Sequence, residues 1–302
     1  MRITVTGATG VIGSRLVADL RARGDEVTVL SRDPGRAGTA LGTEAHRWEP
    51  GAGPPPAEAL EQRDAVVHLA GENIAQRWND ETRRRIHESR EQGTRRLVEG
   101  LAAVPGDARP KTLVSMSGIG YYGDRGDELV DEDTPPGDDF LANVCIAWEA
   151  EAEAATELGV RVVRTRNGVV LDRHAGALAK MLPPFKLGVG GPVAGGRQYL
   201  PWVHLDDAVG VITAALDDAA WSGAYNLVAP DPVTNAEFSK ALGRALHRPA
   251  VLPVPAFALK VLYDGMAQLV TDGQRAVPRR ALEQGYAHRH PGLDAALRDA
   301  LA

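Results

Sequence analysis

Residues 1–20 read MRITVTGATGVIGSRLVADL, and this stretch decides the fold. The apolar, β-branched run over residues 1–6 predicts a short buried strand, and helical spacing of apolar residues begins after Gly13. Between them lies the turn GATGVIG. A strand, a glycine-rich turn and a helix in that order place backbone N–H groups and a helix N-terminus where a pyrophosphate can sit. The order therefore predicts dinucleotide binding at residues 7–13.

The three glycines of this turn have different tasks. Gly7 permits the tight turn, Gly10 lets the backbone approach the phosphates, and Gly13 lets the helix pack close to the strand. Glycines also make plain loops, but here the flanking strand and helix are both present. The predicted cofactor contacts of the turn are Gly7, Thr9, Gly10, Val11, Ile12 and Gly13.

Composition limits the class of protein. The 302 residues are 44% hydrophobic, enough for a large core, and a net charge of −6 argues against a general affinity for nucleic acid. The single cysteine, Cys145, rules out an internal disulfide and fits a reducing compartment. We see no apolar run long enough for a membrane span and no secretory leader before the first strand. We expect a cytoplasmic protein, monomeric or homodimeric, without nucleic-acid or membrane partners.

The end of the second predicted strand, residues 26–30, indicates which nicotinamide cofactor binds. An acid there accepts hydrogen bonds from the adenosine ribose hydroxyls, whereas an arginine accommodates a 2′-phosphate. Ser31 stands at the expected acid position and Arg32 follows it, which favours NADP(H). Two other interpretations stay open: Arg32 as a solvated residue at a strand end, and Asp33 turning inward to bind NAD.

Strands alternate with helices along the first two thirds of the chain. After the second strand, the pattern predicts strands at 45–48, 64–71, 111–117, 160–166 and 225–228, and helices at 80–103 and 140–158. This alternation predicts an α/β fold of the Rossmann type, a doubly wound parallel sheet covered by helices on both faces. The acidic segment 124–139 reads as a surface loop.

Small residues end the strand at 64–71 and leave room for a ligand to lie across the sheet. Glu72 and Asn73 follow and would face that crevice, although a solvent-exposed turn is an equal alternative. The remaining predicted cofactor residues are Leu69, Ala70, Gly71, Glu72, Arg90 and Ser115.

From about residue 172 the pattern changes. The periodicity is broken at residues 180–186, which contain Pro183 and Pro184, and in the glycine-dense run 188–196. These two segments suggest a loop-rich lobe over the carboxyl edge of the sheet. Residues 199–207 return to the sheet margin, a capping box at 234–237 begins a helix, and helices are expected near 256–270 and 292–301. The predicted division is a dinucleotide-binding domain at 1–171, with 199–228 returning to it, and a smaller substrate lobe formed by 172–198 and 229–302.

These landmarks resemble the extended short-chain dehydrogenase/reductase superfamily, which includes nucleotide-sugar epimerases. The likeness is greatest to its "epimerase family" branch, which carries a C-terminal domain of unknown function. The motifs that carry it are GATGVIG at 7–13, LAGENI at 69–74, GYYG at 120–123, MLPPF at 181–185, GGP at 190–192, WVH at 202–204 and GQRAVP at 273–278. The resemblance spans nearly the whole chain. It implies the C-terminal domain at about 249–298 and an oxidoreductase or epimerase acting on a small polar substrate, such as a sugar nucleotide.

The chain departs from the superfamily at its catalytic pair. Characterised members use Tyr-x-x-x-Lys, in which the lysine lowers the phenol pKa so that tyrosine can exchange a proton with a substrate hydroxyl. Counting back from Glu149 places the two positions at Leu141 and Cys145, and the Tyr-x-x-x-Lys spacing occurs nowhere in the chain.

Candidate substitutes for the pair are Ser117, Tyr121, Tyr122 and Lys180, and each has a structural role as its competing interpretation. Ser117 lies at or next to the place of the superfamily's catalytic Ser/Thr. Two hypotheses follow: an NADP-dependent oxidoreductase or epimerase with a rearranged proton relay, and a non-catalytic NADPH-binding regulatory or assembly protein. The spacing of His, Cys and Asp predicts no metal site, and His204 is expected to organise a strand end before a helix.

Overall fold

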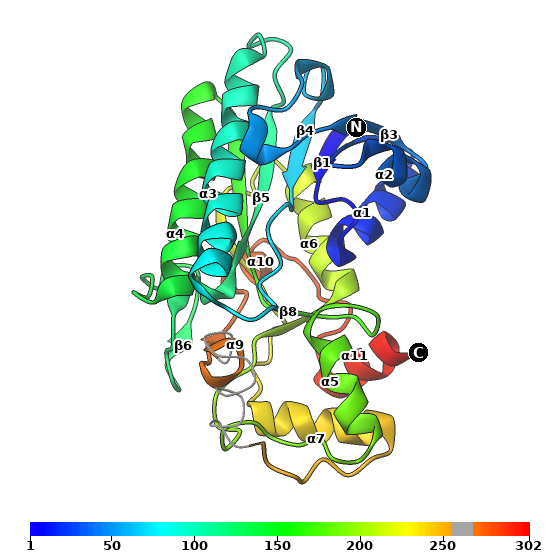
Figure 1. The fold of residues 1–302 in the computed structure, drawn as a ribbon, viewed down its shortest axis with the longest axis vertical. Helices are drawn as coiled ribbons and strands as arrows, with labels where there is room; N and C mark the ends of the chain where they lie inside the picture. Colours follow the sequence, from blue (N-terminus) through cyan, green and yellow to red (C-terminus); the bar gives the residue numbers. More distant parts are fainter. Residues whose placement is uncertain (255–267) are drawn as a thin grey trace.

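The computed structural model of the chain describes residues 1–254 and 268–302 (Figure 1). Its centre is a seven-stranded sheet in the order β10-β7-β5-β4-β1-β2-β3, with every neighbouring pair parallel. The strands are β1 Arg2–Thr6, β2 Glu26–Ser31, β3 Glu44–Arg47, β4 Ala65–His68, β5 Thr112–Gly118, β7 Arg161–Asn167 and β10 Gly223–Leu227. The predicted doubly wound parallel sheet is confirmed.

Alternating side chains give the sheet two separate apolar faces. In β4, Ala65 and Val67 pack in one core and Val66 in the other, as the period of two requires. The first core is covered by α1 Val11–Ala22, α2 Pro34–Leu41 and α6 Leu205–Asp217. The second is covered by α3 Asp80–Ala103 and α4 Phe140–Glu153, which run side by side in Figure 1.

Short 3₁₀ turns occur at Pro50–Ala52, Ala57–Ala59, Ile119–Tyr122 and Ala154–Leu158. The last of these turns ends the helix predicted at 140–158.

A third core, separate from the two on the faces of the sheet, lies beyond the carboxyl edge of the sheet. It is built from β8 Val169–Leu171, α5 Gly176–Lys186, β9 Trp202–His204, α7 Asn235–Leu246 and α11 Leu293–Leu301. The expectation of a loop-rich segment at 180–186 is wrong, because these residues belong to α5. Leu178, Leu182 and Phe185 follow helical spacing and are buried in this core, and their burial outweighs the two prolines within the helix.

Residues 199–207 do not join the main sheet, contrary to expectation. β9 pairs in parallel with β8, with Val169 opposite Trp202. The separation begins at Gly168, where an added Cβ would lie 2.7 Å from the Pro201 carbonyl oxygen. The Val169 N–H donates to that oxygen at 2.7 Å, so the chain leaves β7 here and pairs with the lobe instead. The segment returns to the sheet through α6, which packs on α1, and through β10 at the edge.

The acidic segment 124–139 is more than a surface loop. It contains β6 Leu129–Val130, which pairs in parallel with β11 Arg275–Ala276 of the tail. The carboxylate of Glu132 is buried and accepts hydrogen bonds from the backbone N–H groups of Asn226 and Arg280. The segment therefore ties the C-terminal part of the chain to the sheet.

The tail agrees with the sequence where it is described. Thr234 and Glu237 form the expected reciprocal capping box at the start of α7, and α11 matches the predicted last helix. The remaining tail helices are α9 Gln268–Thr271 and α10 Arg279–Glu283. Of the helix predicted near 256–270, residues 256–267 lie outside the described residues. Within the described ranges, no helix has both the length and the apolar character needed to cross a bilayer.

The His68 side chain allows a test of this packing. It is buried at the end of β4, with Nδ1 2.7 Å from Thr6 Oγ1 and Nε2 3.1 Å from Thr94 Oγ1. Burial lowers the pKa of His68 to about 4. Between pH 6.5 and 4 the unfolded chain therefore binds a proton that the folded chain does not, and stability falls as the pH falls. We expect this group to lower the free energy of unfolding by about 3 kcal/mol as the pH falls from 6.5 to 4.

Urea unfolding of the wild type and His68→Gln at several pH values measures this effect. The variant should show a smaller loss of unfolding free energy between pH 6.5 and 4, whereas His174→Gln, at an exposed position, should behave like the wild type. The pKa values of His204 and His288 are also lowered by burial and contribute with the same sign, so only the difference between variants is informative. Equal pH slopes for wild type and His68→Gln would contradict the assignment.

Candidate cofactor and active site

The β1–α1 turn leaves no room for side chains. Gly7 has φ +66°, and an added Cβ would lie 2.6 Å from the carbonyl carbon of Leu69. A Cβ on Gly13 would lie 2.4 Å from the Gly7 carbonyl oxygen. Gly10 is the N-cap of α1 and no side-chain hydrogen bond caps this helix. The first N–H groups of α1 therefore face outward without intrahelical partners, as a cofactor pyrophosphate requires.

Thr6 fixes the turn against the end of β4. Its Oγ1 lies 2.7 Å from His68 Nδ1 and accepts hydrogen bonds from the N–H groups of Leu69 and Ala70, each at 3.2 Å. Leu69 and Ala70 therefore lie directly beside the glycine turn. The structure brings these predicted cofactor residues together at one edge of the sheet.

The end of β2 presents Arg32 to solvent. Asp33 is the N-cap of α2, and its Oδ1 accepts a hydrogen bond from the Arg36 N–H at 3.0 Å. Ser31 Oγ contacts the backbone of Asp33 at 3.2 Å. Because the Asp33 carboxylate caps a helix, the geometry favours Arg32 over Asp33 as the group that meets an adenosine ribose.

Arg90 lies half-buried beneath the loop after β4, although most other arginines of its helix are ion-paired at the surface. Its Nη2 donates to the Glu72 carbonyl at 3.0 Å and its Nη1 donates to the Ile86 carbonyl at 3.1 Å. The guanidinium carbon lies 5.0 Å from the centre of the Trp148 ring, and burial lowers the Arg90 pKa. A Cβ on Gly71 would lie 3.2 Å from this guanidinium, so glycine at this position allows the loop to pack directly on Arg90.

A cavity of about 250 Å³ opens at the carboxyl ends of β5 and β7. Its walls come from both parts of the molecule. The first part supplies Ile74, Ile86, Arg90, residues 116–120, Asp139, Leu141, Val144, Cys145, Trp148 and residues 167–169; the second supplies residues 199–201, Gln268, Asp272 and Gln274. Most of the lining side chains are apolar, as is usual for small-molecule sites.

Ser117 connects this cavity to a buried ion pair. Its Oγ donates a hydrogen bond to Glu149 Oε1 at 2.8 Å. Arg166 holds the same carboxylate with two bonds, Nε to Oε1 at 2.8 Å and Nη2 to Oε2 at 2.9 Å. The Glu149 and Arg166 side chains are each 4% exposed, so the pair is shielded from water.

Leu141 and Cys145 both line the cavity. These are the two positions that the superfamily's Tyr and Lys would occupy, so the missing pair leaves an apolar side chain and a thiol in the cavity wall. Burial raises the pKa of Cys145 to about 11, which keeps the thiol protonated at neutral pH. Neither residue supplies a base or a cation.

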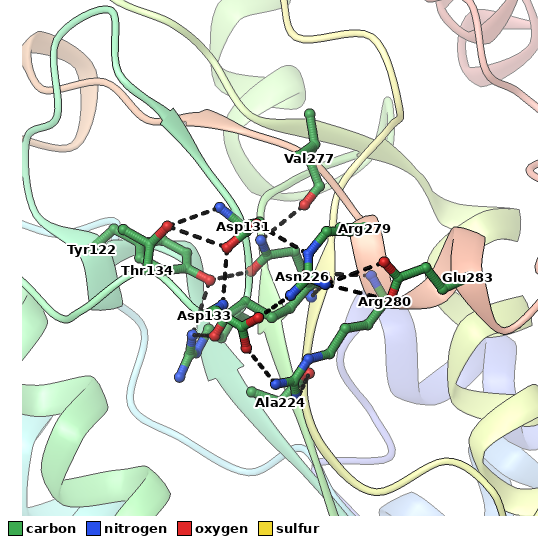
Figure 2. A network of polar contacts seen from close by, with 12 residues as sticks. Tyr122, Asp131, Asp133, Thr134, Ala224, Asn226, Val277, Arg279, Arg280 and Glu283 are labelled. Atoms are coloured by element: carbon green, nitrogen blue, oxygen red, sulfur yellow. Dashed lines mark hydrogen bonds and ion pairs between the residues drawn. The ribbon is translucent and has the colours of Figure 1, made fainter.

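Tyr122 has its hydroxyl engaged in the core. It is fully buried, donates to Asn226 Oδ1 at 2.7 Å and accepts from Arg166 Nη1 at 2.9 Å. Figure 2 shows Tyr122 pointing toward Asn226, next to the arginines of α10. Burial raises the Tyr122 pKa to about 12. The phenol is outside the cavity lining, and this geometry disfavours the predicted proton-transfer role.

The other candidates also lie away from the cavity lining. The Tyr121 ring packs edge-to-face on Tyr122, with the Arg166 guanidinium carbon 3.4 Å from its centre. Lys180 is exposed on α5 and donates to the Ala75 carbonyl, which ties the lobe to the loop after β4. Ser115 is buried within β5, opposite His68 on β4. Of the four catalytic candidates, only Ser117 lines the cavity.

The cavity residues that the sequence analysis did not nominate include Trp148, Asn167 and Tyr199. Trp148 Nε1 and Asn167 Oδ1 are buried and have no hydrogen-bond partner within the described part of the chain. Buried polar atoms are normally satisfied, so a donor and an acceptor without partners in one cavity wall indicate a site for a polar ligand. The signal that could have found Asn167 is its position at the carboxyl end of a strand, next to Gly168.

The fold and this site define a class of dinucleotide-binding proteins with an extended lobe over the sheet edge. A sequence profile of the "NAD dependent epimerase/dehydratase family" matches residues 3–227, and a profile of a "Domain of unknown function (DUF1731)" matches residues 254–300. The chain therefore belongs to the NAD-dependent epimerase/dehydratase family, with the C-terminal domain of the predicted branch.

Relatives match along the whole chain. The human epimerase family protein SDR39U1 is 39% identical over 307 residues, covering 100% of both chains. Its chloroplastic homologue from Arabidopsis thaliana is 40% identical, covering 99% of this chain and 86% of the relative. A crystal structure of the human protein with NADPH superimposes with a TM-score of 0.87, covering 99% of each chain. A nucleoside-diphosphate sugar epimerase from Corynebacterium glutamicum gives a TM-score of 0.79 at 32% identity, covering 100% of this chain and 58% of that one.

Replacing Arg32 tests the cofactor site. We expect the wild type to bind NADPH more tightly than NADH, and Arg32→Ala to weaken NADPH binding about 10- to 100-fold while leaving NADH unchanged, because one charged hydrogen-bonding group is lost. Parallel calorimetric titrations of both nucleotides measure this. Arg298→Ala, at an exposed position on α11, is the control. Equal affinities in the wild type would assign the ribose to Asp33, and failure to bind either nucleotide would contradict the site itself.

Proposed function

We propose that this protein is an NADP(H)-dependent oxidoreductase or epimerase that acts on a small polar substrate and exchanges the substrate's proton through Ser117. The observation that carries the proposal is the hydrogen bond from Ser117, in the cavity wall, to the buried carboxylate of Glu149. The glycine turn and Arg32 fit the cofactor, and NADPH is bound in the human relative. When bound, the cofactor supplies or accepts a hydride. The single cysteine favours a reducing compartment such as the cytoplasm.

The orientation of the Ser117 hydroxyl determines what it can do. Because its proton points to Glu149, its oxygen faces a ligand as an acceptor. A substrate hydroxyl can donate to Ser117 Oγ, and as that proton transfers, the serine proton can pass to Glu149 Oε1. Arg166 fixes the carboxylate in place for this exchange. The route would replace the missing tyrosine with a serine–carboxylate relay.

The cavity limits the substrate. About 250 Å³ is below the roughly 300–1,000 Å³ of pockets that enclose drug-sized ligands, so a small molecule suits it better than an entire sugar nucleotide. The unpartnered Trp148 Nε1 offers a hydrogen-bond donor and Asn167 Oδ1 an acceptor. Arg90 adds a positive charge. We infer a compact substrate with at least one hydroxyl or carbonyl group.

A second candidate function rests on Leu141 and Cys145. With an apolar side chain and a protonated thiol where the superfamily places its catalytic pair, the cavity suits a protein that binds NADPH without turnover. Such a protein would act as a regulator or assembly partner that senses the cofactor's redox state. It predicts tight NADPH binding, no substrate-dependent oxidation, and a partner affinity that differs between NADPH and NADP⁺.

Ser117→Ala separates the two functions. NADPH oxidation at 340 nm is first screened with small aldehydes and ketones, and NADP⁺ reduction with the matching alcohols. For any substrate found, we expect Ser117→Ala to lower kcat by about 10²–10⁴-fold, the usual contribution of a positioned proton-transfer group, with unchanged affinity for NADPH. Ser239→Ala, which changes a buried serine on α7 outside the cavity lining, is the matched control and should retain turnover.

Two results would contradict the oxidoreductase proposal. If Ser117→Ala kept full activity on a substrate that the wild type turns over, the relay would be wrong. If the wild type bound NADPH but oxidised it with none of the compounds, the regulatory function would be favoured. Glu149→Gln is a weaker test, because removing one partner of a buried ion pair destabilises the fold by about 3–5 kcal/mol.

A further inference from the structure

Four metal-ligating side chains meet far from the cavity, where the C-terminal helix contacts the sheet domain. They are His204 at the end of β9, Asp206 in the first turn of α6, His290 in the loop before α11, and Asp299 on α11. One possible ligand atom from each residue lies within 4.8 Å of the others. We call these four residues the His–Asp cluster.

The contacts within the His–Asp cluster match a small coordination sphere. His204 Nε2 lies 3.2 Å from Asp299 Oδ2, and His290 Nε2 lies 3.3 Å from Asp206 Oδ2. Ligand atoms around a tetrahedral Zn²⁺ with bonds of about 2.0–2.2 Å lie about 3.3–3.6 Å apart. The two imidazole rings have their centres 3.7 Å apart and are inclined by 33°, which brings their nitrogens into the same small volume.

His204 supplies an independent indication of a ligand. Its side chain is 5% exposed, and Nε2 is buried without a hydrogen bond to any described residue, although Asp299 Oδ2 lies 3.2 Å away. A buried ring nitrogen is expected to have a partner, and here the open position lies toward the other cluster residues.

Charge also favours a cation. Three carboxylates act on His204, those of Asp206, Asp299 and the neighbouring Asp207. One positive charge faces them, because Nη2 of Arg15 on α1 lies 2.7 Å from Asp206 Oδ1. Asp207 is already satisfied by the N–H groups of Arg289 and His290 and by the Tyr286 hydroxyl. With both histidines neutral, one positive charge faces three negative charges, and a divalent ion would complete the balance.

We propose that His204, Asp206, His290 and Asp299 form a binding site for a divalent transition-metal ion, with Zn²⁺ as the best fit. Two imidazoles and two carboxylates are ligands that Zn²⁺ accepts in closed, structural sites. The ion would fasten α11 and the preceding loop to β9 and α6. The sequence pattern gave no sign of the site because 95 positions separate His204 from Asp299. The site is independent of the proposed reaction.

Metal binding requires one change in the site. His204 Nδ1 now accepts a hydrogen bond from the Asp206 N–H at 3.2 Å, so a neutral ring carries its proton on Nε2. Coordination through Nε2 requires this proton to move to Nδ1, and the contact with the Asp206 N–H is then lost.

Calorimetric titration of the EDTA-treated full chain with ZnCl₂ tests the proposal. We expect one Zn²⁺ per chain, a Kd below about 1 μM, a higher Tm, and affinity that declines as the pH falls, because the ligand atoms must be deprotonated to bind the ion. Co²⁺ should give the visible absorption of a tetrahedral complex. Asp299→Asn and His290→Ala should each weaken Zn²⁺ binding about 100-fold or more.

Asp294→Asn is the matched control, because it changes another exposed carboxylate on α11 outside the cluster, and it should bind Zn²⁺ like the wild type. The Asp299 side chain is 57% exposed, so its replacement should leave the metal-free fold intact, which circular dichroism and NADPH titration verify. Weak, non-stoichiometric binding in the wild type, or equal binding by Asp294→Asn and Asp299→Asn, would overturn the site.

Discussion

The close contact between the β1–α1 turn and the end of β4 is the constraint on which the cofactor face depends. Gly7 lies so near the backbone of Leu69 and Ala70 that no side chain fits between them. Thr6 Oγ1 then accepts both of the adjacent N–H groups, so the two strand ends are held at a fixed distance. Because all seven strands of the sheet are parallel, their carboxyl ends lie at the same edge of the sheet as this contact.

A second constraint, the Glu149–Arg166 pair, links the cavity to the tail. Besides holding Glu149, Arg166 donates to the Tyr122 hydroxyl and the Glu132 carbonyl. Tyr122 in turn holds Asn226, whose side-chain amide donates to the Val277 carbonyl in the tail, as Figure 2 shows. A buried pair with so many partners is costly to break, by about 3–5 kcal/mol. The polar groups that sequence motifs nominate for catalysis near residue 120 are therefore mostly used to join the two parts of the chain.

The sequence predicted the features that depend on local pattern. The apolar strands of the sheet, the long α3, the glycine turn and the capping box at Thr234 all arise from neighbouring residues, and each is confirmed. The mistakes concern distant partners. α5 forms despite two prolines because a remote core buries its apolar face, and β6 exists only because β11 pairs with it. Within the site, counting along α4 put the superfamily's two catalytic positions at Leu141 and Cys145, and both residues line the cavity.

Local sequence patterns do not show which polar side chains are buried. Tyr122 and Ser117 stand five residues apart in the sequence, yet one faces the core and the other the cavity. Arg90 looks like its neighbours in an arginine-rich helix, and only the loop after β4 shows that it is covered.

The C-terminal domain is part of the site rather than an addition to it. Gln274 Nε2 donates to the Gly123 carbonyl, and Arg279 and Arg280 pair with Asp131 and Asp133 of the acidic segment. These contacts bring Gln268, Asp272 and Gln274 into the cavity wall opposite Ser117. For the proposed substrate, these tail residues would set part of the size and polarity of the space around the Ser117 hydroxyl.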